Sequence, residues 1–309
     1  MSAPAQNILV IKLGALGDFV QALGPFAAIR QYHRDARITL LTTMPFEDLA
    51  AQSGYFDDIW IDDRPALWRI GAILSLRRRL RGGAFERIYD LQTADRTNFY
   101  YRLLGRPKPE WSGIAPGCSH PDPNPDRDAL HTIERQRGQL MAAGLENVPL
   151  SDLSWLPHDS DKFDLPSGFV LLVAGGSAHR QDKRWPAMQY AQLARQLVVM
   201  GRQPVLLGGA ADRSATAAIV KSCPGVIDLT NRTSLADIAS LAVAAAGAVG
   251  NDCGPMHLIA ASGCPSLVLF SHASDPALCA PRGADVAILR RASLEDLDVN
   301  AVEAALRLR

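Results

Sequence analysis

The strongest constraint on the fold is an alternation of short aliphatic runs with segments of helical periodicity, repeated along the whole chain. In the first half, the expected strands span residues 7–12, 37–43, 58–61 and 87–91. The expected helices between and after them span residues 19–32, 46–52, 67–80, 96–104 and 131–143. A chain that repeats strand and helix in this order forms a mostly parallel sheet with helices on both faces.

The same rhythm starts again in the second half, although the two halves share no detectable sequence repeat. The expected strands there span residues 168–173, 204–207, 226–229, 246–250 and 266–270. The expected helices span residues 186–199, 212–222, 235–244, 255–262 and 294–308. We therefore predict an α/β protein of two Rossmann-like, doubly wound domains that face each other across a ligand-binding cleft.

Two proline-rich stretches interrupt the alternation. Residues 107–128 are predicted to form a long, irregular surface loop near the end of the first domain. Residues 147–166 are polar and broken by three prolines, so we place the linker there. The predicted domains are residues 1–155 and 156–309. The last helix follows the second domain in sequence but can pack against the first domain.

Composition excludes several classes of function. Lys plus Arg and Asp plus Glu number 32 each, so no overall positive charge favours nucleic acid. The five cysteines are scattered and form no C-x-x-C pair, which is typical of reduced thiols in a cytoplasmic protein without structural zinc. The first six residues lack the features of a signal peptide, and the most apolar stretch, residues 241–249, is too short to span a bilayer. We expect a cytoplasmic protein whose membrane contact is at most peripheral.

Residues 250–261 combine a strand end, a glycine-containing turn and the start of a helix. An apolar run that ends at Val249 precedes Gly250, and a helix-like run follows Pro255. Proline suits the first helical position, because the N–H that it lacks would have no partner there. The free N–H groups and the positive end of the helix dipole make such a turn a site for an anion.

A second glycine turn follows the first strand of the second half. Gly175, Gly176 and Ser177 end that strand, and Lys183 and Arg184 come just before the next helix. The glycines allow the backbone to approach an anion closely, and the two cations can neutralise a phosphate. A solvated basic loop explains the same residues equally well.

A third turn, Gly208 and Gly209, leads to Asp212. The carboxylate of Asp212 is either a helix N-cap, the interpretation we favour, or a ligand of ribose hydroxyls. All three turns point to the carboxyl edge of one sheet, and this convergence favours a ligand site more than any single turn does.

Other polar residues have a structural explanation beside a functional one. Asp18, at the start of the first helix, is either an N-cap or the general base for a hydroxyl nucleophile. His257 fits a buried core position. The D-x-D patterns at 126–128 and 296–298 are interpreted as chance matches rather than metal sites. The arginine cluster within 69–81 is a solvated helix face, or a surface for an anionic acceptor or a phospholipid.

Together these motifs resemble glycosyltransferase family 9, the ADP-heptose:lipopolysaccharide heptosyltransferases. The resemblance covers most of the chain and rests on four marks that follow the family's order. They are Ile11-Lys12-Leu13-Gly14-Ala15-Leu16-Gly17-Asp18, then Asp90-Leu91-Gln92, then Gly175-Gly176-Ser177 with Lys183-Arg184-Trp185-Pro186, and lastly Asn251-Asp252-Cys253-Gly254-Pro255-Met256-His257-Leu258. The resemblance implies a GT-B fold and an inverting transfer of heptose from ADP-heptose to a lipopolysaccharide core acceptor, Kdo-lipid A or a heptosyl unit.

The resemblance also implies roles for single residues. It makes Asp18 the catalytic base, and it makes Lys183 the lysine that binds the donor diphosphate. The implied donor-binding residues are Gly175, Gly176, Ser177, Arg184, Gly209, Asp212, Asp252, Cys253, Gly254, Pro255, Met256 and His257. The implied acceptor-binding residues are Gly17, Gln92, Arg69 and Arg96. Two positions depart from the family: Cys253 stands where Thr or Ser is common, and Asp212 or Arg213 stands where many members carry Glu.

The expected partners are a nucleotide-sugar donor and an anionic glycolipid acceptor, with peripheral contact to the inner membrane of a Gram-negative cell and no nucleic acid. No cofactor and no metal are expected, because Lys183 and the amides of the helix N-terminus can stabilise the leaving diphosphate. The alternatives are a GT-B transferase with another donor, a sugar-nucleotide epimerase, and a binding protein without catalytic activity.

Overall fold

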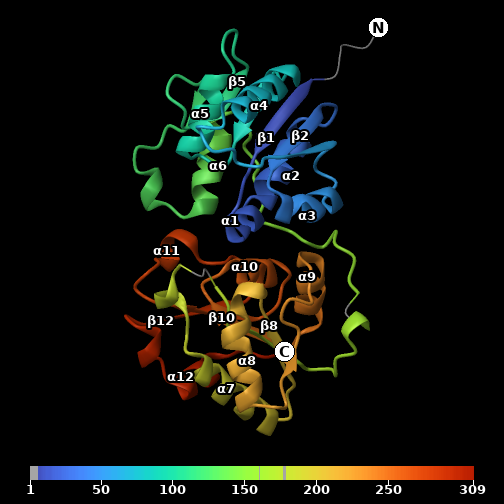
Figure 1. Cartoon of the computed structure of the whole chain (residues 1–309), viewed down its shortest axis with the longest axis vertical. Helices are drawn as coiled ribbons and strands as arrows, with labels where there is room; N and C mark the ends of the chain where they lie inside the picture. The colour runs from blue at the N-terminus through green and yellow to red at the C-terminus, as the bar shows by residue number, and fades with distance from the viewer. Residues whose placement is uncertain (1–5, 160, 177–178) are drawn as a thin grey trace. The chain divides into compact units, whose positions relative to one another are not determined.

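Two parallel six-stranded sheets, one in each half of the chain, organise the protein. The computed structural model describes residues 6–159, 161–176 and 179–309. The chain divides into two compact units between Ser151 and Asp152, four residues before the predicted boundary, and Figure 1 shows a sheet flanked by helices in each unit. Each unit is called a domain below.

The sheet of the first domain has the strand order β3-β2-β1-β4-β5-β6, with every pair parallel. Its strands are β1 (Asn7–Ile11), β2 (Arg37–Thr42), β3 (Asp58–Ile61), β4 (Arg87–Asp90), β5 (Glu110–Gly113) and β6 (His120–Pro121). Strand β1 is central and almost completely buried, because parallel strands covered by helices on both faces are apolar along their whole length.

The helices of the first domain are α1 (Leu16–Gln21), α2 (Leu23–Tyr32), α3 (Glu47–Gln52), α4 (Ile70–Gly82), α5 (Asp95–Leu103) and α6 (Thr132–Ala142). The prediction of one helix over 19–32 is wrong, since the helix breaks at Ala22. Pro25 lacks an N–H and is tolerated only in a first helical turn, so a new helix begins at Leu23.

The proline-rich stretch is not the irregular loop that its sequence predicts. It contributes β5 and β6 to the edge of the sheet, and Trp111 in β5 is completely buried. The backbone N–H of Trp111 donates to Ser119 Oγ, which ties the loop between the two strands. Both strands are very short, and the outer one, β6, contains Pro121 at the sheet edge, where proline is tolerated.

The sheet of the second domain has the order β12-β11-β10-β7-β8-β9. Its strands are β7 (Val170–Val173), β8 (Pro204–Leu207), β9 (Ile227–Asp228), β10 (Gly247–Asn251), β11 (Ser266–Phe270) and β12 (Val286–Arg290). Strand β12 was not predicted. It is a partly exposed edge strand, so its sequence lacks the continuous apolar run of the buried strands.

The helices of the second domain are α7 (Ala187–Val199), α8 (Arg213–Ser222), α9 (Leu235–Ala244), α10 (Gly254–Ala261), α11 (Pro276–Cys279) and α12 (Val299–Ala305). The last helix is shorter than predicted and packs against α7 and β12. Val299 and Val302 belong to the core of the second domain, and the indole of Trp185 donates to the carbonyl of Leu297 at 2.9 Å. Within the described residues, no helix is long and apolar enough to cross a membrane.

Candidate active site

Three glycine turns of the second domain lie at the carboxyl ends of adjacent strands. The order β10-β7-β8 places the turns after Asn251, Val173 and Leu207 side by side at one sheet edge, as the sequence predicts. Parallel sheets bind ligands at this edge, where loops can present backbone amides without disturbing the strands. Ser177 lies outside the described residues.

The side chain of Asn251 joins two of these turns. Its amide nitrogen donates to the carbonyls of Ala174 and Gly175, both at 3.0 Å. Its amide oxygen accepts from the backbone of Trp185 at 2.9 Å and from the hydroxyl of Tyr190 at 3.1 Å. Asn251 is completely buried, so these bonds hold the glycine loop and the start of α7 in one arrangement.

Asp212 does not have the N-cap role that we favour from the sequence, while its role as a ribose ligand stays a prediction. It stands at the N-cap position of α8, but its carboxylate does not cap that helix. Instead it accepts from the amides of Gly176 at 3.3 Å and Gly209 at 3.0 Å and pairs with Arg184 at 3.2 Å. A Cβ on Gly175 would lie 2.4 Å from this carboxylate, so any other residue there would displace the Asp212 side chain. Asp212 therefore locks two glycine turns together.

Lys183 is held at the same edge by an acidic partner. Its ammonium lies 2.5 Å from a carboxylate oxygen of Asp252, and the hydroxyl of Ser274 donates to that oxygen at 2.7 Å. Arg180 also reaches this loop, donating to the carbonyl of Ala273 at 3.0 Å. The loop after β11, which the sequence did not single out, is thus a fourth part of the site.

The N-terminus of α10 completes this edge. Cys253 is the N-cap residue and its side chain makes no capping hydrogen bond. The helix begins at Gly254, so Pro255 is its second residue, one place later than predicted. Burial raises the pKa of the Cys253 thiol to about 12, so this side chain is neutral at physiological pH. Met256 and His257 are buried in the helix and not presented to solvent. The part of α10 that can meet an anion is therefore its backbone.

In the first domain, Asp18 lines a cavity of about 200 Å³. Asp18 is the third residue of α1, whose N-cap is Ala15, and one carboxylate oxygen accepts from the Ala15 amide at 3.2 Å. The N-cap interpretation of Asp18 is therefore wrong by three positions. The other residues that line the cavity are Lys12, Leu91, Gln92, Thr93, Arg127, Asp128, Thr132, Arg135 and Gln136.

Two side chains of this cavity are buried polar groups that sequence reasoning missed. Lys12 is 4% exposed and donates to the carbonyl of Leu91 at 2.9 Å. Burial lowers the pKa of Lys12, and the charges of Asp18 and Asp90 oppose that shift. Gln136 is also 4% exposed, and neither atom of its amide has a hydrogen-bond partner among the described residues. The sequence offers one clue to Lys12, a charged residue at the end of an aliphatic run. It offers no comparable clue to Gln136.

The predicted acceptor-binding residues are not all brought together. Gln92 lines the cavity beside Asp18, and its side chain accepts from the amide of Leu13 at 2.9 Å. Gly17 is buried in α1 next to Asp18. Arg69 and Arg96 are not among the residues that line this cavity. Arg96 donates to Pro65 and Tyr100, and Arg69 is exposed before α4.

The D-x-D patterns have structural roles. Asp128 lies 3.5 Å from both Arg127 and Arg135 at the cavity beside Asp18. Asp298 caps α12 by accepting from the amide of Asn300. Among the described residues, no three His, Cys, Asp or Glu side chains are grouped as metal ligands.

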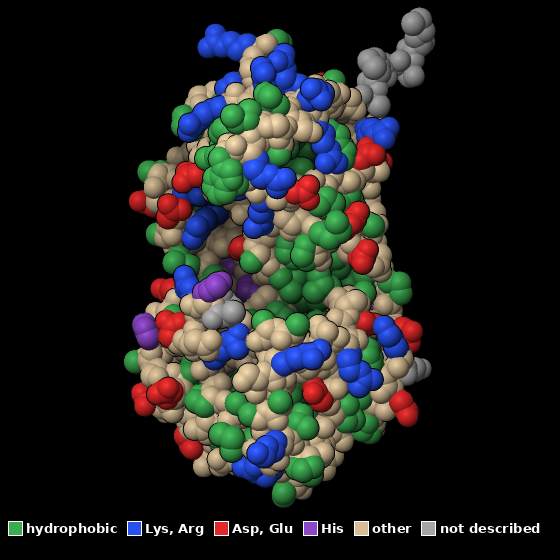
Figure 2. Space-filling model, in the orientation of Figure 1, with side chains coloured by type: hydrophobic (Ala, Val, Ile, Leu, Met, Phe, Trp, Pro, Cys, Tyr) green, Lys and Arg blue, Asp and Glu red, His purple; other side chains and the backbone are tan. Residues whose placement is uncertain are grey.

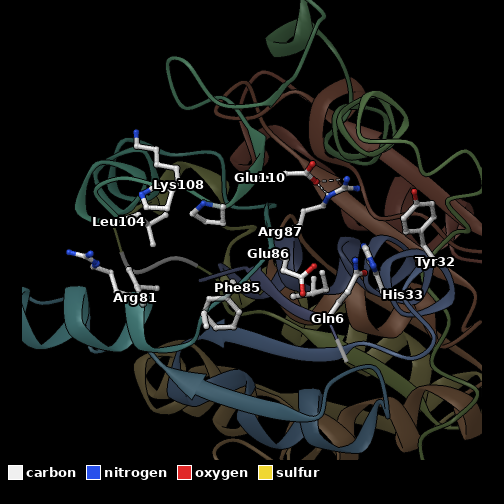
Figure 3. Close-up of a pocket in the computed structure, with 15 residues that line it drawn as sticks. Gln6, Tyr32, His33, Arg81, Phe85, Glu86, Arg87, Leu104, Lys108 and Glu110 are labelled. Carbon is white, nitrogen blue, oxygen red and sulfur yellow. Dashed lines mark hydrogen bonds and ion pairs between the residues drawn. The ribbon is translucent and has the colours of Figure 1, made fainter. Parts of the chain in front are cut away.

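A larger cavity of about 900 Å³ lies at the opposite, amino-terminal edge of the first sheet. Figure 3 shows Arg87 paired with Glu110 on one side, and Arg81, Leu104 and Lys108 on the other. The cavity does not include Asp18 or any other predicted site residue. Its size alone therefore does not make it the active site.

The chain has two Rossmann-like domains, and three glycine turns lie at one sheet edge of the second domain, which is the architecture of the GT-B class. A family model of glycosyltransferase family 9 (heptosyltransferase) matches residues 129–303, which is more than half of the chain. The protein belongs to this family.

Curated and solved relatives agree with this placement. Lipopolysaccharide heptosyltransferase 2 of Salmonella typhimurium is 35% identical over 104 residues, which span 32% of this chain and only 30% of that protein. The Escherichia coli ADP-heptose heptosyltransferase II superposes with a TM-score of 0.80 at 21% identity, covering 97% of both chains. An E. coli heptosyltransferase solved with ADP gives a TM-score of 0.76 at 17% identity, covering 97% of this chain and 98% of that one. The structural likenesses show the fold.

Proposed function

We propose that this protein is an inverting glycosyltransferase that moves a heptose from ADP-heptose to a lipopolysaccharide core acceptor, either Kdo-lipid A or a heptosyl unit. Family membership carries this proposal, supported by the glycine turns at one sheet edge. The relatives are named for lipopolysaccharide heptose transfer, and one was solved with ADP.

The second domain is proposed to bind the donor. The diphosphate would lie against the first turn of α10, with Lys183 as its cation. As the glycosidic bond to the diphosphate breaks, negative charge grows on the leaving phosphate. Amide dipoles and an ammonium fixed in place stabilise that charge without reorganising. Asn251 and Asp212 would act indirectly, by holding the loops.

The first domain is proposed to bind the acceptor. Asp18 would take the proton from an acceptor hydroxyl as its oxygen attacks the anomeric carbon, and one such displacement inverts the configuration. The cavity beside Asp18 also contains Asp128, but its three cations, Lys12, Arg127 and Arg135, outnumber the two carboxylates. An acceptor that carries carboxylate or phosphate groups suits these charges.

No cofactor or divalent metal takes part in the proposed reaction. The charge that a metal would neutralise is assigned to Lys183 and to the amides of α10. Transfer should therefore proceed unchanged in excess EDTA, and a rate that returns only on adding Mg²⁺ would contradict this part of the proposal.

The proposed location is the cytoplasm, at the cytoplasmic face of the inner membrane. The five cysteines, all free thiols in the structure, suit a reducing compartment. Detection of the protein outside the cytoplasm and inner-membrane fractions would contradict it.

The direct test is product analysis. The purified protein is incubated with ADP-heptose and a heptose-deficient lipopolysaccharide acceptor, and the acceptor mass is measured. An acceptor heavier by one heptose, with release of ADP, is the expected result. Transfer from UDP- or GDP-sugars instead would reassign the donor. An altered sugar-nucleotide formed without acceptor would indicate an epimerase, and an unchanged donor with every acceptor would indicate a binding protein.

A further inference from the structure

Residues 64–85 of the first domain combine a one-signed charge with exposed apolar side chains. This stretch contains six arginines and neither Asp nor Glu. Leu67 is 64% exposed, Trp68 83%, Ile70 69% and Leu74 50%. A large aromatic side chain exposed beside three exposed aliphatic ones is unusual for a surface that only contacts water.

Helical geometry collects these residues on one side of α4. At 100° per residue, Ile70, Leu74, Arg77, Arg78 and Arg81 fall within one stripe of the helix. Leu76 and Leu80 lie on another stripe, which is buried in the core of the first domain. The outer stripe is therefore apolar near the start of α4 and cationic near its end. We call this stripe, together with Leu67, Trp68 and Arg69, the α4 face.

Most of its cations have no partner to neutralise them. The side chains of Arg69, Arg78 and Arg81 make no hydrogen bond or ion pair with the described residues. Lys108 adds a further charge, because it lies with Arg81 on the same side of the cavity in Figure 3. Figure 2 shows Lys and Arg side chains gathered over the part of the first domain that carries α4 and β5.

We propose that the α4 face binds the surface of a bilayer that contains anionic phospholipids. A membrane interface offers apolar chains beside negative headgroups, which matches the two halves of the stripe. Tryptophan is favoured at that depth, because its ring is mostly apolar while its N–H meets water. The aliphatic part of an arginine side chain can lie along the apolar surface while its guanidinium contacts the phosphates.

Binding through the α4 face would keep the enzyme at the membrane that contains its glycolipid acceptor. This benefit rests on the proposed function, but membrane binding itself needs neither donor nor acceptor. Vesicle binding and sugar transfer therefore test the two proposals separately. If the protein binds vesicles but transfers no sugar, the membrane-binding proposal stands and the proposed function is wrong.

The test is co-sedimentation of the full-length protein with two kinds of vesicle. One contains phosphatidylcholine alone, and the other contains phosphatidylcholine mixed with phosphatidylglycerol. Stronger partitioning into the mixed vesicles is expected, with a decrease at high salt. The double variant Arg78→Ala, Arg81→Ala should partition about thirtyfold more weakly into the mixed vesicles, because each cation near an anionic surface strengthens binding about fivefold.

The apolar half of the α4 face has its own variant. Trp68→Ser with Ile70→Ser should weaken binding at both salt concentrations, since apolar insertion is not screened. The matched controls are Arg282→Ala and Val199→Ser, exposed residues of the second domain, and both should leave partitioning unchanged. All these side chains are at the surface, so the variants should unfold at the temperature of the wild type.

Fluorescence of Trp68 supplies a readout specific to insertion. It is the most exposed tryptophan of the five, and Trp111 and Trp185 are buried. The emission should shift to shorter wavelength on adding mixed vesicles, and Trp68→Phe should lose the shift while it still binds. No binding by the wild type, equal loss in the controls, or binding indifferent to the Trp68 and Ile70 changes would overturn the proposal. A dimer without lipid that Trp68→Ser dissociates would also overturn it.

Discussion

The ammonium of Lys183 and the carboxylate of Asp252 form an ion pair of 2.5 Å, although 69 residues separate them in the chain. Both side chains are largely buried. The lysine assigned to the donor diphosphate is therefore already paired with an internal anion. A bound diphosphate would have to share or replace that partner.

This pairing predicts opposite effects for its two members. Lys183→Met should weaken ADP binding about tenfold or more, because a hydrogen bond to a charged group contributes roughly 1.5–3 kcal/mol. Asp252→Asn should tighten ADP binding severalfold, because it frees the ammonium. Isothermal titration with ADP measures both. Lys162→Met, which breaks the Lys162–Asp237 pair of the same domain, is the control and should not alter ADP affinity. Equal affinities for all three variants would remove Lys183 from the donor site.

Asp18→Asn should lower kcat by about 10²- to 10⁴-fold, the usual contribution of a general base. ADP affinity should stay at the wild-type value, since Asp18 belongs to the first domain and the donor is assigned to the second. Initial rates with saturating donor and acceptor provide the measurement. Asp35→Asn, which changes an exposed carboxylate of the same domain, should retain full activity. Near-normal turnover by Asp18→Asn would assign the base elsewhere.

Cys253→Ser should strengthen ADP binding severalfold. The thiol is a weak hydrogen-bond donor, whereas a hydroxyl at the N-cap of α10 can donate to a phosphate oxygen. Cys253→Ala is the matched control and should bind ADP as the wild type does. If serine and alanine give the same affinity, this side chain does not meet the phosphate.

Asp90 makes a pH-dependent contribution to stability. Burial raises its pKa to about 6 from the ordinary 3.8, so the folded state binds more protons than the unfolded state between these values. This carboxyl therefore stabilises the protein less as pH rises from about 4 to about 6. Across that interval, the free energy of unfolding of Asp90→Asn should rise by ~3 kcal/mol relative to that of the wild type.

Urea unfolding of Asp90→Asn and the wild type at a series of pH values measures this difference. His33 acts in the opposite sense, since burial lowers its pKa to about 4, but it is present in both proteins and cancels. Asp35→Asn should differ from the wild type in free energy of unfolding by an amount that does not vary with pH over the same interval. If the difference for Asp90→Asn is also independent of pH, burial does not raise the pKa of Asp90.

The sequence by itself determined the α/β alternation and the glycine turns of the second domain. Buried parallel strands are apolar along their length, so strands such as Val170–Val173 can be recognised from a local run. The turns are equally local, because a glycine after such a strand marks a tight connection to the next helix. Short or exposed strands lack this signal, which is why β5, β6 and β12 were missed.

Only the tertiary structure decided which polar groups meet. Asp212 binds the amide of Gly176 rather than capping α8, and Gln136 joins Asp18 at one cavity. These pairings follow from strand order and from how helices pack on the sheet. A local pattern cannot contain them, because residues far apart in the chain compete for the same partners. A local motif can therefore predict some residues of a site, whereas the tertiary structure determines which residues they contact.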